Sequence, residues 1–369
     1  MIILTFISCN KRNDKYTNQL EFQKKELASS AAWPSIISTK NGSILIFYQK
    51  ATNIGLPNQV KVSIEMIKSF DGGNSWQQPI NVFDLPSEAT SKGYIVSQIR
   101  NLAVGTLTNN RVVLAFTVQE YPIDFNGNRI IDTITNASFK IKGLYTMFSD
   151  NEGVSFSIPR KLETNKIIAP TPHFRIITDK NNSAFMSVYG GTNSTWTNSA
   201  VEIYKSIDNG QSFNFFSTLE SVYKPPFGET SLLSVDSVFH AYVRTDSNVV
   251  VQYISRNYCE SWDLRGVVTN KWQIPAQPIF TKSKKVFLFS GKRDFPYQII
   301  ARVSNDFGNT YSEPKKIIDL SSPNSGYPNA VETSSGILLT YYVMPSTSNY
   351  KDDWLQSKVY LTFFHETNF

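Results

Sequence analysis

The chain has 369 residues, of which 41% are hydrophobic and 13% aromatic, so it is long enough to bury a sizeable core. Its formal net charge is +6, but lysine and arginine are scattered, which argues against nucleic-acid binding and leaves a preference for acidic ligands open. The only two cysteines, Cys9 and Cys259, exclude a disulfide framework.

The first nine residues, MIILTFISC, form an apolar run that ends at Cys9 and is followed by the polar stretch NKRNDKYTNQ. This pattern resembles the end of a bacterial lipoprotein signal with Cys9 as the lipidated residue, although the run is short and lacks a basic start, which indicates a truncated signal. The alternative is a plain apolar N-terminus. We therefore expect an exported periplasmic or outer-surface lipoprotein that contacts the membrane only through its lipid, since no other stretch is long enough to span a bilayer.

From residue 28 onward, short segments rich in Ile, Val, Phe and Tyr alternate with turn residues, and no long stretch has a helical period. This pattern predicts an all-β fold. Six hairpins are expected, at residues 34–49, 100–119, 174–190, 230–244, 278–292 and 329–343.

Five segments share the spacing Ser-x-Asp/Asn-x-Gly-x-Ser/Thr-aromatic, with Cys259 in the glycine place of one copy. We call them the repeat turns: SFDGGNSW (69–76), SDNEGVSF (149–156), SIDNGQSF (206–213), SRNYCESW (255–262) and SNDFGNTY (304–311). The Asp or Asn and the Ser or Thr can close a tight turn, and the aromatic ring can pack below it. Because Asp becomes Asn in two copies, these residues favour a structural role over acid catalysis.

Four-stranded units repeated about every 50 residues are typical of a β-propeller, whose blades stack radially. We predict a single six-bladed β-propeller over residues 28–369. Residues 10–27 form a polar tether and a closing strand, because LEFQKKE (20–26) can supply the outer strand of the last blade.

If the four strands of each blade alternate in direction, the repeat turns and the hairpin turns lie on the same rim of the propeller, that is, at the same end of its central axis. The starts of the first strands and the ends of the second strands then lie on the opposite rim. That rim is expected to hold Ala32, Trp33, Gln49, Lys50, Arg100, Gln119, Glu120, His173, Arg175, Glu229, Arg244, Arg293, Asp294, Tyr327, Tyr341 and Tyr342.

The repeat turns on a six-bladed propeller resemble the Asp-box proteins, and the span from residue 28 to the end is similar to the sialidase (neuraminidase) superfamily. GETSLL (228–233), AYVR (241–244) and SGYPNAV (325–331) are similar to three stretches that carry functional residues in that family. The resemblance implies a retaining exo-glycoside hydrolase without a cofactor. The resemblance also implies that Tyr327 is the nucleophile, that Glu229 is its base, and that Arg244 is part of a clamp on the sugar carboxylate.

Two departures from the family pattern affect this expectation. Ala32 stands where the family has its first clamp arginine, and no Asp or Glu lies between Gln49 and Ile64, where its acid/base aspartate normally sits. Arg100 and Arg293 are candidates to form a rearranged anion site with Arg244.

The insertion at residues 121–136 follows Glu120 and contains Asp124, so either carboxylate is a candidate acid, and Tyr342 is a further candidate for substrate contact. His173 and His240 lack metal-ligand spacing, and we expect no metal. Cys259 is expected to be a small buried hydrophobe.

Two functions therefore stay open. The first is hydrolysis of terminal acidic sugars on glycans, and the second is a catalytically inactive propeller that binds glycan or protein. In both cases we expect a monomer.

Overall fold

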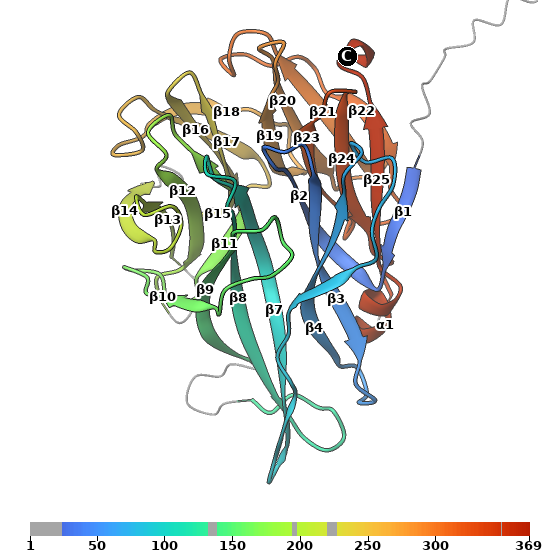
Figure 1. Cartoon of the computed structure of the whole chain (residues 1–369). Coiled ribbons are helices and arrows are strands. Elements are labelled where there is room, and N and C mark those ends of the chain that lie inside the picture. The colour runs from blue at the N-terminus through green and yellow to red at the C-terminus, as the bar shows by residue number, and fades with distance from the viewer. Residues whose placement is uncertain (1–23, 132–138, 194–197, 220–226, 348) are drawn as a thin grey trace, which may run out of the picture.

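The structure is a computed structural model of the chain, and it describes residues 24–131, 139–193, 198–219, 227–347 and 349–369. Strands make up most of the described chain (Figure 1), which confirms the predicted all-β class. The helical elements among these residues are α1 (Tyr350–Leu355) and the 3-10 helix η1 (Glu366–Asn368). Cys9 lies outside the described residues, so its lipidation stays a prediction.

The strands pair into four sheets, and consecutive strands within each group are antiparallel. Three of the sheets have four strands each. They are β15 (Phe227–Val235), β16 (Val238–Thr245), β17 (Val250–Ser255) and β18 (Asp263–Val267); β19 (Gln273–Phe280), β20 (Val286–Lys292), β21 (Gln298–Ser304) and β22 (Lys315–Asp319); and β23 (Gly326–Glu332), β24 (Ile337–Val343), β25 (Lys358–Phe364) and β1 (Lys24–Ser29).

The fourth sheet contains thirteen strands in three groups. Short parallel pairings of β7 with β4 and with β11 join these groups. The groups are β2 (Ala31–Ser38), β3 (Ile44–Asn53), β4 (Val60–Ser69) and β5 (Ile80–Phe83); β7 (Gly93–Thr106), β8 (Val112–Ile123), β9 (Lys140–Ser149) and β10 (Arg160–Leu162), with β6 (Glu88–Thr90) on β7; and β11 (Thr171–Thr178), β12 (Ala184–Gly191), β13 (Ser199–Ser206) and β14 (Asn214–Leu219).

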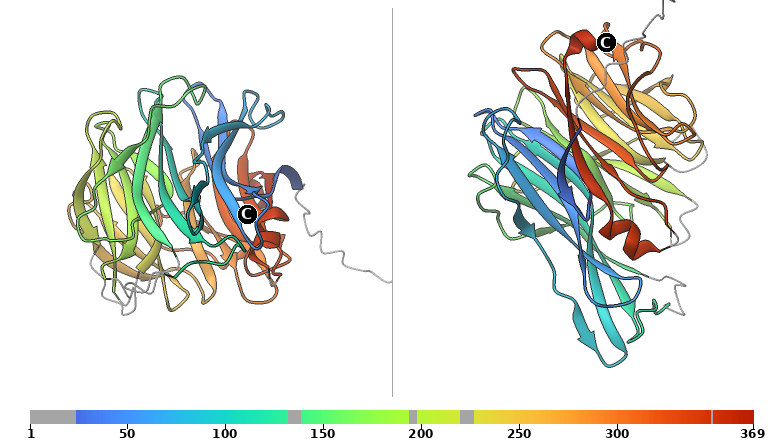
Figure 2. Two further views of the ribbon diagram at one scale, coloured as in Figure 1. Left: turned by 90° about the horizontal axis from the view of Figure 1, so that it is seen from below. Right: turned by 90° about the vertical axis from the view of Figure 1, so that its right-hand side faces the viewer.

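The first strand of each group, which we call an inner strand, packs against the next inner strand along the chain. The contacts run in the order β2, β7, β11, β15, β19, β23 and back to β2. Figures 1 and 2 show the first segments (blue) beside the last (red). Buried apolar residues fill the space between neighbouring groups, as where Phe47 and Ile64 pack with Leu114 and Phe116. The core is thus divided among the interfaces between neighbouring groups of strands.

The last sheet combines the two ends of the described chain. β1 pairs antiparallel with β25, with Lys24 opposite Thr362 and Glu26 opposite Tyr360. This is the position that the sequence analysis gave to LEFQKKE, of which Lys24, Lys25 and Glu26 are described. The pairing covers the outer edge of β25, which limits exposed strand edges.

The repeat turns make the hydrogen bonds that their spacing predicts. In the first, Ser69 Oγ donates to Asp71 Oδ1 and accepts from Gly73 N, both at 2.8 Å, while Asp71 Oδ1 accepts from Ser75 N at 2.9 Å. The same pattern recurs around Asn151, Asp208, Asn257 and Asp306. An amide oxygen replaces the carboxylate without loss of the pattern, as a structural turn requires.

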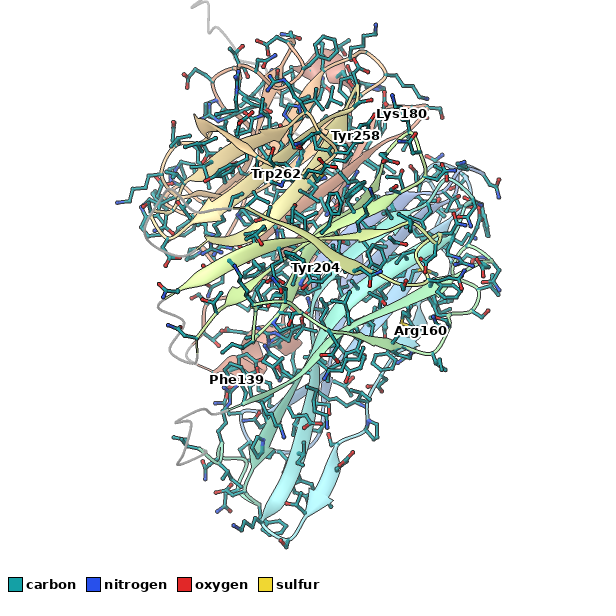
Figure 3. All side chains as sticks on the ribbon, turned by 90° about the vertical axis from the view of Figure 1, so that its left-hand side faces the viewer. Phe139, Arg160, Lys180, Tyr204, Tyr258 and Trp262 are labelled. Atoms are coloured by element: carbon teal, nitrogen blue, oxygen red, sulfur yellow. The ribbon has the colours of Figure 1, made fainter. Side chains whose placement is uncertain are left out.

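The repeat turns lie against the hairpin turns that join first and second strands. Glu152 of the second repeat turn accepts hydrogen bonds of 2.8 Å from Asn41 and Asn110, which belong to two such hairpin turns. Lys180 of a third hairpin turn lies 6.0 Å from the ring of Tyr258 in the fourth repeat turn (Figure 3). These contacts place both kinds of turn on one rim, as the strand directions predicted.

Cys259 occupies the glycine place of the fourth repeat turn with φ of 70°, in the left-handed region. Its side chain is fully buried in the cluster that includes Phe185 and Phe239, and burial raises the pKa of its thiol. It therefore behaves as the small buried hydrophobe that the sequence predicted.

We expect Ser69→Ala to lower the free energy of unfolding by about 0.5–1.5 kcal/mol, because the partly buried Gly73 N–H loses its hydrogen bond to the buried Ser69 hydroxyl. Chemical denaturation measures the change. Ser91→Ala, at an exposed turn position, is the matched control. Equal stability of the two variants would contradict a structural role for the turn.

Candidate active site

All six inner strands shift their register against the second strand of their group, as a β-bulge does. In β2, β7, β11 and β23 the shift contains a residue with φ between 47° and 49°: Trp33, Asn101, Phe174 and Tyr327. A bulge sets two residues against one on the partner strand and so changes the direction of side chains. Because positive φ is unfavourable for non-glycine residues, such positions often mark functional sites.

Tyr327, Glu229 and Arg244 meet in one hydrogen-bonded cluster. Tyr327 Oη donates to Glu229 Oε1 at 2.5 Å, and Arg244 Nη1 donates to Glu229 Oε2 at 2.6 Å. Arg244 Nη1 also lies 3.5 Å from Tyr327 Oη. Tyr327 and Glu229 are buried, whereas the side chain of Arg244 is 29% exposed. The structure thus brings together the predicted nucleophile, base and first arginine, and only the arginine faces solvent appreciably.

Charges around this cluster favour an ionised carboxylate beside a neutral phenol. Burial by itself raises the pKa of Glu229, but Arg244 and the hydrogen bond from Tyr327 contribute to lowering that pKa to about 2. Burial raises the pKa of Tyr327, the charge of Glu229 adds to this rise, and Arg293 and Arg244 oppose it. At neutral pH Glu229 is therefore a proton acceptor and Tyr327 a proton donor.

Arg293 follows β20 and reaches the same cluster. The centre of its guanidinium group lies 5.0 Å from the ring centroid of Tyr327, and its Nε donates to the carbonyl oxygen of Ile274 at 3.2 Å. The residue is partly exposed. Asp294, beside it, pairs instead with Lys292 at 3.2 Å. Arg293 thus places a second positive charge beside Tyr327.

Arg100 lies on β7 among polar and aromatic partners. Its Nη1 lies 3.3 Å from Tyr350 Oη and 3.4 Å from Gln98 Oε1, and its guanidinium centre is 5.6 Å from the ring of Trp33. None of the ion pairs among the described residues includes it. Both Arg100 and Arg293 oppose the rise in the pKa of Tyr342, so both lie within electrostatic reach of that side chain.

Tyr342 lies beneath this group of residues. It is 1% exposed, and its ring centroid lies 5.8 Å from that of Tyr327 and 4.9 Å from that of Trp33. Such packing supports the two rings and leaves little of Tyr342 available to a substrate. Its place near the site agrees with its strand-end position, and its contact with a substrate stays a prediction.

The two candidate acids have other partners. Glu120 pairs with Lys142 at 2.9 Å. Asp124 Oδ1 accepts from the backbone N–H groups of Asn126 and Asn128, and its Oδ2 accepts from Asn128 Nδ2, which lowers the pKa of this exposed carboxyl. None of the described contacts joins either residue to Tyr327 or Glu229. The structure therefore does not bring these carboxylates to the cluster, and an acid role for either stays a prediction.

His173 and Trp33 lie beside the Tyr327 cluster, and their sequence positions alone indicate no catalytic role. The ring of His173 is buried 6.4 Å from that of Tyr327, and burial lowers its pKa to about 4, so it is neutral at pH 7. Trp354 from α1 packs 4.9 Å from Trp33. The six residues of α1 are too few to give a periodic sequence signal. The bulged AAWP stretch, noted for its missing arginine, thus supplies an aromatic wall.

We expect the buried neutral imidazole of His173 to make the protein less stable in acid. Its folded pKa of about 4 lies below the unfolded value of roughly 6.5, so this contribution is complete above pH 6.5 and is lost as pH falls toward 4. Denaturation at pH 7 and 4.5 should show a smaller loss of stability in His173→Gln than in the wild type. His365→Gln, at an exposed histidine, is the control and should keep the wild-type loss.

Among the described residues, no group of three or more His, Cys, Asp and Glu side chains is arranged to hold a metal ion. No helix in this part of the chain is long and apolar enough to cross a membrane.

The described strands have the sialidase fold, so the resemblance noted in the sequence is confirmed at the level of the fold. The NanB sialidase from Streptococcus pneumoniae matches with a TM-score of 0.68 and 12% identity over 94% of this chain and 71% of that one. The Trypanosoma rangeli sialidase in complex with the inhibitor DANA matches with a TM-score of 0.64 and 12% identity over 92% of this chain and 55% of its own.

A protein of unknown function from Dyadobacter fermentans matches more completely, with a TM-score of 0.69 and 18% identity over 92% of this chain and 99% of that chain. No protein-family model and no curated protein matches the sequence. The similarity to known structures therefore lies in the fold, with a sequence that has diverged far from theirs.

Proposed function

We propose that this protein is a sialidase-like exo-glycoside hydrolase that cleaves terminal acidic sugars from glycans with retention of configuration. The observation that carries the proposal is the 2.5 Å hydrogen bond from Tyr327 to Glu229, with Arg244 on the second carboxylate oxygen. A neutral tyrosine suits an anionic sugar because it avoids the repulsion that a carboxylate nucleophile would meet. Its high pKa requires an adjacent base, which Glu229 supplies.

In the first step, Tyr327 Oη forms a bond to the anomeric carbon and its proton passes to Glu229. The glycosidic bond breaks, and its electron pair leaves with the aglycone oxygen, which takes a proton from solvent or from an acid. In the second step, water attacks the same carbon and loses a proton to solvent. Tyr327 leaves and recovers its proton from Glu229. Two displacements at one carbon retain its configuration.

Three arginines are available for the sugar carboxylate in this proposal. Arg244 and Arg293 flank Tyr327, and Arg100 enters from β7 on the side of Trp33. Arg100 directly precedes the bulge residue of β7, just as Ala32 directly precedes that of β2. A missing charge-assisted bond at Ala32 would weaken binding by about 1.5–3 kcal/mol, or on the order of tenfold or more. The rearranged arginines favour an acidic sugar other than an ordinary sialoside.

The proposal includes a six-bladed propeller, supported by the cyclic contacts of six inner strands. It also includes export, with lipid attachment at Cys9 and a glycan as the binding partner. A monomer is expected because β1 already covers the outer edge of β25.

A catalytically inactive glycan-binding propeller is the second candidate. It is favoured by one observation, namely that neither Glu120 nor Asp124 contacts the Tyr327 cluster. Such a protein would keep the arginines for binding without turnover.

A turnover screen with aryl glycosides of sialic acids, other nonulosonic acids, uronic acids and neutral sugars separates the two candidates. We expect release of the aryl group from at least one acidic sugar and none from neutral sugars. Product that first appears as the same anomer as the substrate, detected by NMR, would support two displacements. Binding of an acidic glycan without any turnover would instead establish the inactive propeller.

A further inference from the structure

A cavity of about 480 Å³ lies at the other end of the inner strands, toward the hairpin turns. All six inner strands contribute to its lining, which marks it as the end of the central space that they surround. Each strand supplies one aliphatic residue to the lining, and together these six residues form a ring. The ring consists of Ile37, Val104, Ile176, Leu233, Ile279 and Val331.

Arg175 also lines this cavity and crosses the centre of the molecule. It lies on β11, and its Nη2 donates to the carbonyl oxygen of Ala330 on β23. In the cyclic order of inner strands, β11 and β23 are opposite each other. The side chain therefore spans the central space between the Tyr327 cluster and the aliphatic ring. Phe174, the residue before it, packs 6.2 Å from the ring of Tyr327.

No carboxylate neutralises Arg175 among the described residues. It takes part in none of their ion pairs, and its Nε is buried without a hydrogen-bond partner. Burial lowers its pKa to about 10, with no neighbouring charge opposing the change, so the guanidinium is charged at neutral pH. Arg175 is partly buried, and a charge withdrawn from water in this way is costly unless an anion pairs with it.

The other polar groups of the cavity leave this charge uncompensated. Glu332 is the acidic residue of the lining, and its two carboxylate oxygens accept from the backbone N–H of Lys282 at 3.0 and 3.2 Å. Lys282 is exposed and adds a second positive charge. Thr106 Oγ1, also in the lining, is buried without a partner.

We propose that this cavity binds a small organic monocarboxylate, with its carboxylate on Arg175 and its apolar body inside the aliphatic ring. The planar guanidinium matches a carboxylate in a two-bond arrangement. An inorganic oxyanion would satisfy the arginine but would make no apolar contact with the aliphatic part of the lining. Ser38, Thr178 and Ser234 also line the cavity, and the aliphatic residues are the part of the lining that an apolar body would contact. The volume is within the usual range for small-molecule sites.

Isothermal titration at constant ionic strength tests this proposal, with hexanoate, the neutral hexanamide and sulfate as probes of the wild-type chain. We expect hexanoate to bind at least about tenfold more tightly than either other probe, because only hexanoate has both the charge and the apolar body. Equal affinity for sulfate, equal affinity for hexanamide, or no binding of hexanoate would each overturn the proposal.

Variants locate the site. Arg175→Met keeps the length of the side chain without its charge and should weaken hexanoate binding at least about tenfold. Lys282→Gln, at the exposed mouth, should change it less than about threefold. Leu233→Trp keeps Arg175, fills the ring and should also abolish binding, which covers the case in which Arg175→Met fails to fold. Unchanged hexanoate binding in folded Arg175→Met or Leu233→Trp would overturn the assignment.

Discussion

Replacing Tyr327 by phenylalanine is expected to lower kcat on an activated acidic glycoside by on the order of a thousandfold or more, with a much smaller change in KM. The substitution removes the oxygen that forms the glycosyl-enzyme bond and keeps the ring that packs against Trp33, Phe174 and Tyr342. The arginines, which bind the sugar in the proposed function, stay in place. Steady-state kinetics on the best aryl substrate from the screen measures both constants.

The same substitution should leave the fold intact. Glu229 keeps its 2.6 Å bond to Arg244, so the buried carboxylate is still paired, and the loss of one hydrogen bond to a charged group costs about 1.5–3 kcal/mol. Tyr341→Phe is the matched control, since Tyr341 is also fully buried on β24 but belongs to a different core cluster from Tyr327. Comparable loss of kcat in both variants would show that buried hydroxyl groups act through packing, and Tyr327 would lose its assignment as nucleophile.

The all-β class could be predicted because its signals are local. Alternating apolar residues and Asn-Gly-like turns set each hairpin, and the hydrogen bonds of a repeat turn such as 69–76 join residues at most four positions apart. The pairing of β1 with β25 joins Lys24 to Thr362, yet it followed from counting strands and finding one missing. The parallel contacts of β7 with β4 and β11 had no such signal, because they depend on how the groups pack in space.

Parts of the site could be predicted where one short stretch of sequence contains the functional residue and also shows where on a strand that residue lies. Glu229 lies near the start of β15 and Arg244 near the end of β16, so the antiparallel pairing of these strands brings them together. Asp124 shows the limit of this reasoning, since its nearby Asn126 and Asn128 hold the carboxylate in a local turn. The amino-acid sequence of a loop alone does not show which groups a carboxylate in that loop will contact.

The aromatic residues around Trp33 and the central Arg175 show a different limit. Trp33 acquires its neighbours through a bulge and through α1, about 320 residues further along the chain. The contact of Arg175 with Ala330 spans opposite inner strands. Side-chain partners across the cyclic order of inner strands depend on how the six groups pack in space, which no local motif specifies.

Hydrolysis should depend strongly on the leaving group, because no described contact gives the Tyr327 cluster an acid that could protonate the aglycone. General acid catalysis typically contributes about a hundredfold to ten-thousandfold, and a glycoside of an acidic phenol needs it least because the phenolate leaves unaided. We therefore expect kcat/KM for an aryl glycoside to exceed that for the natural oxygen-linked disaccharide of the same sugar by about that factor. A series of substituted phenyl glycosides should show rates that rise steeply as the phenol becomes more acidic.

Two variants connect this dependence to the structure. Asp124→Asn and Glu120→Gln should leave the rate on the most activated aryl glycoside within about threefold of the wild type, since that substrate needs no acid. If either residue moves to the aglycone when substrate binds, its variant should lose activity selectively on the disaccharide, and azide or another small nucleophile should not restore it. Efficient cleavage of natural sialyl-lactose that survives both substitutions would contradict the expected dependence, because the site would then possess an acid that neither Asp124 nor Glu120 supplies.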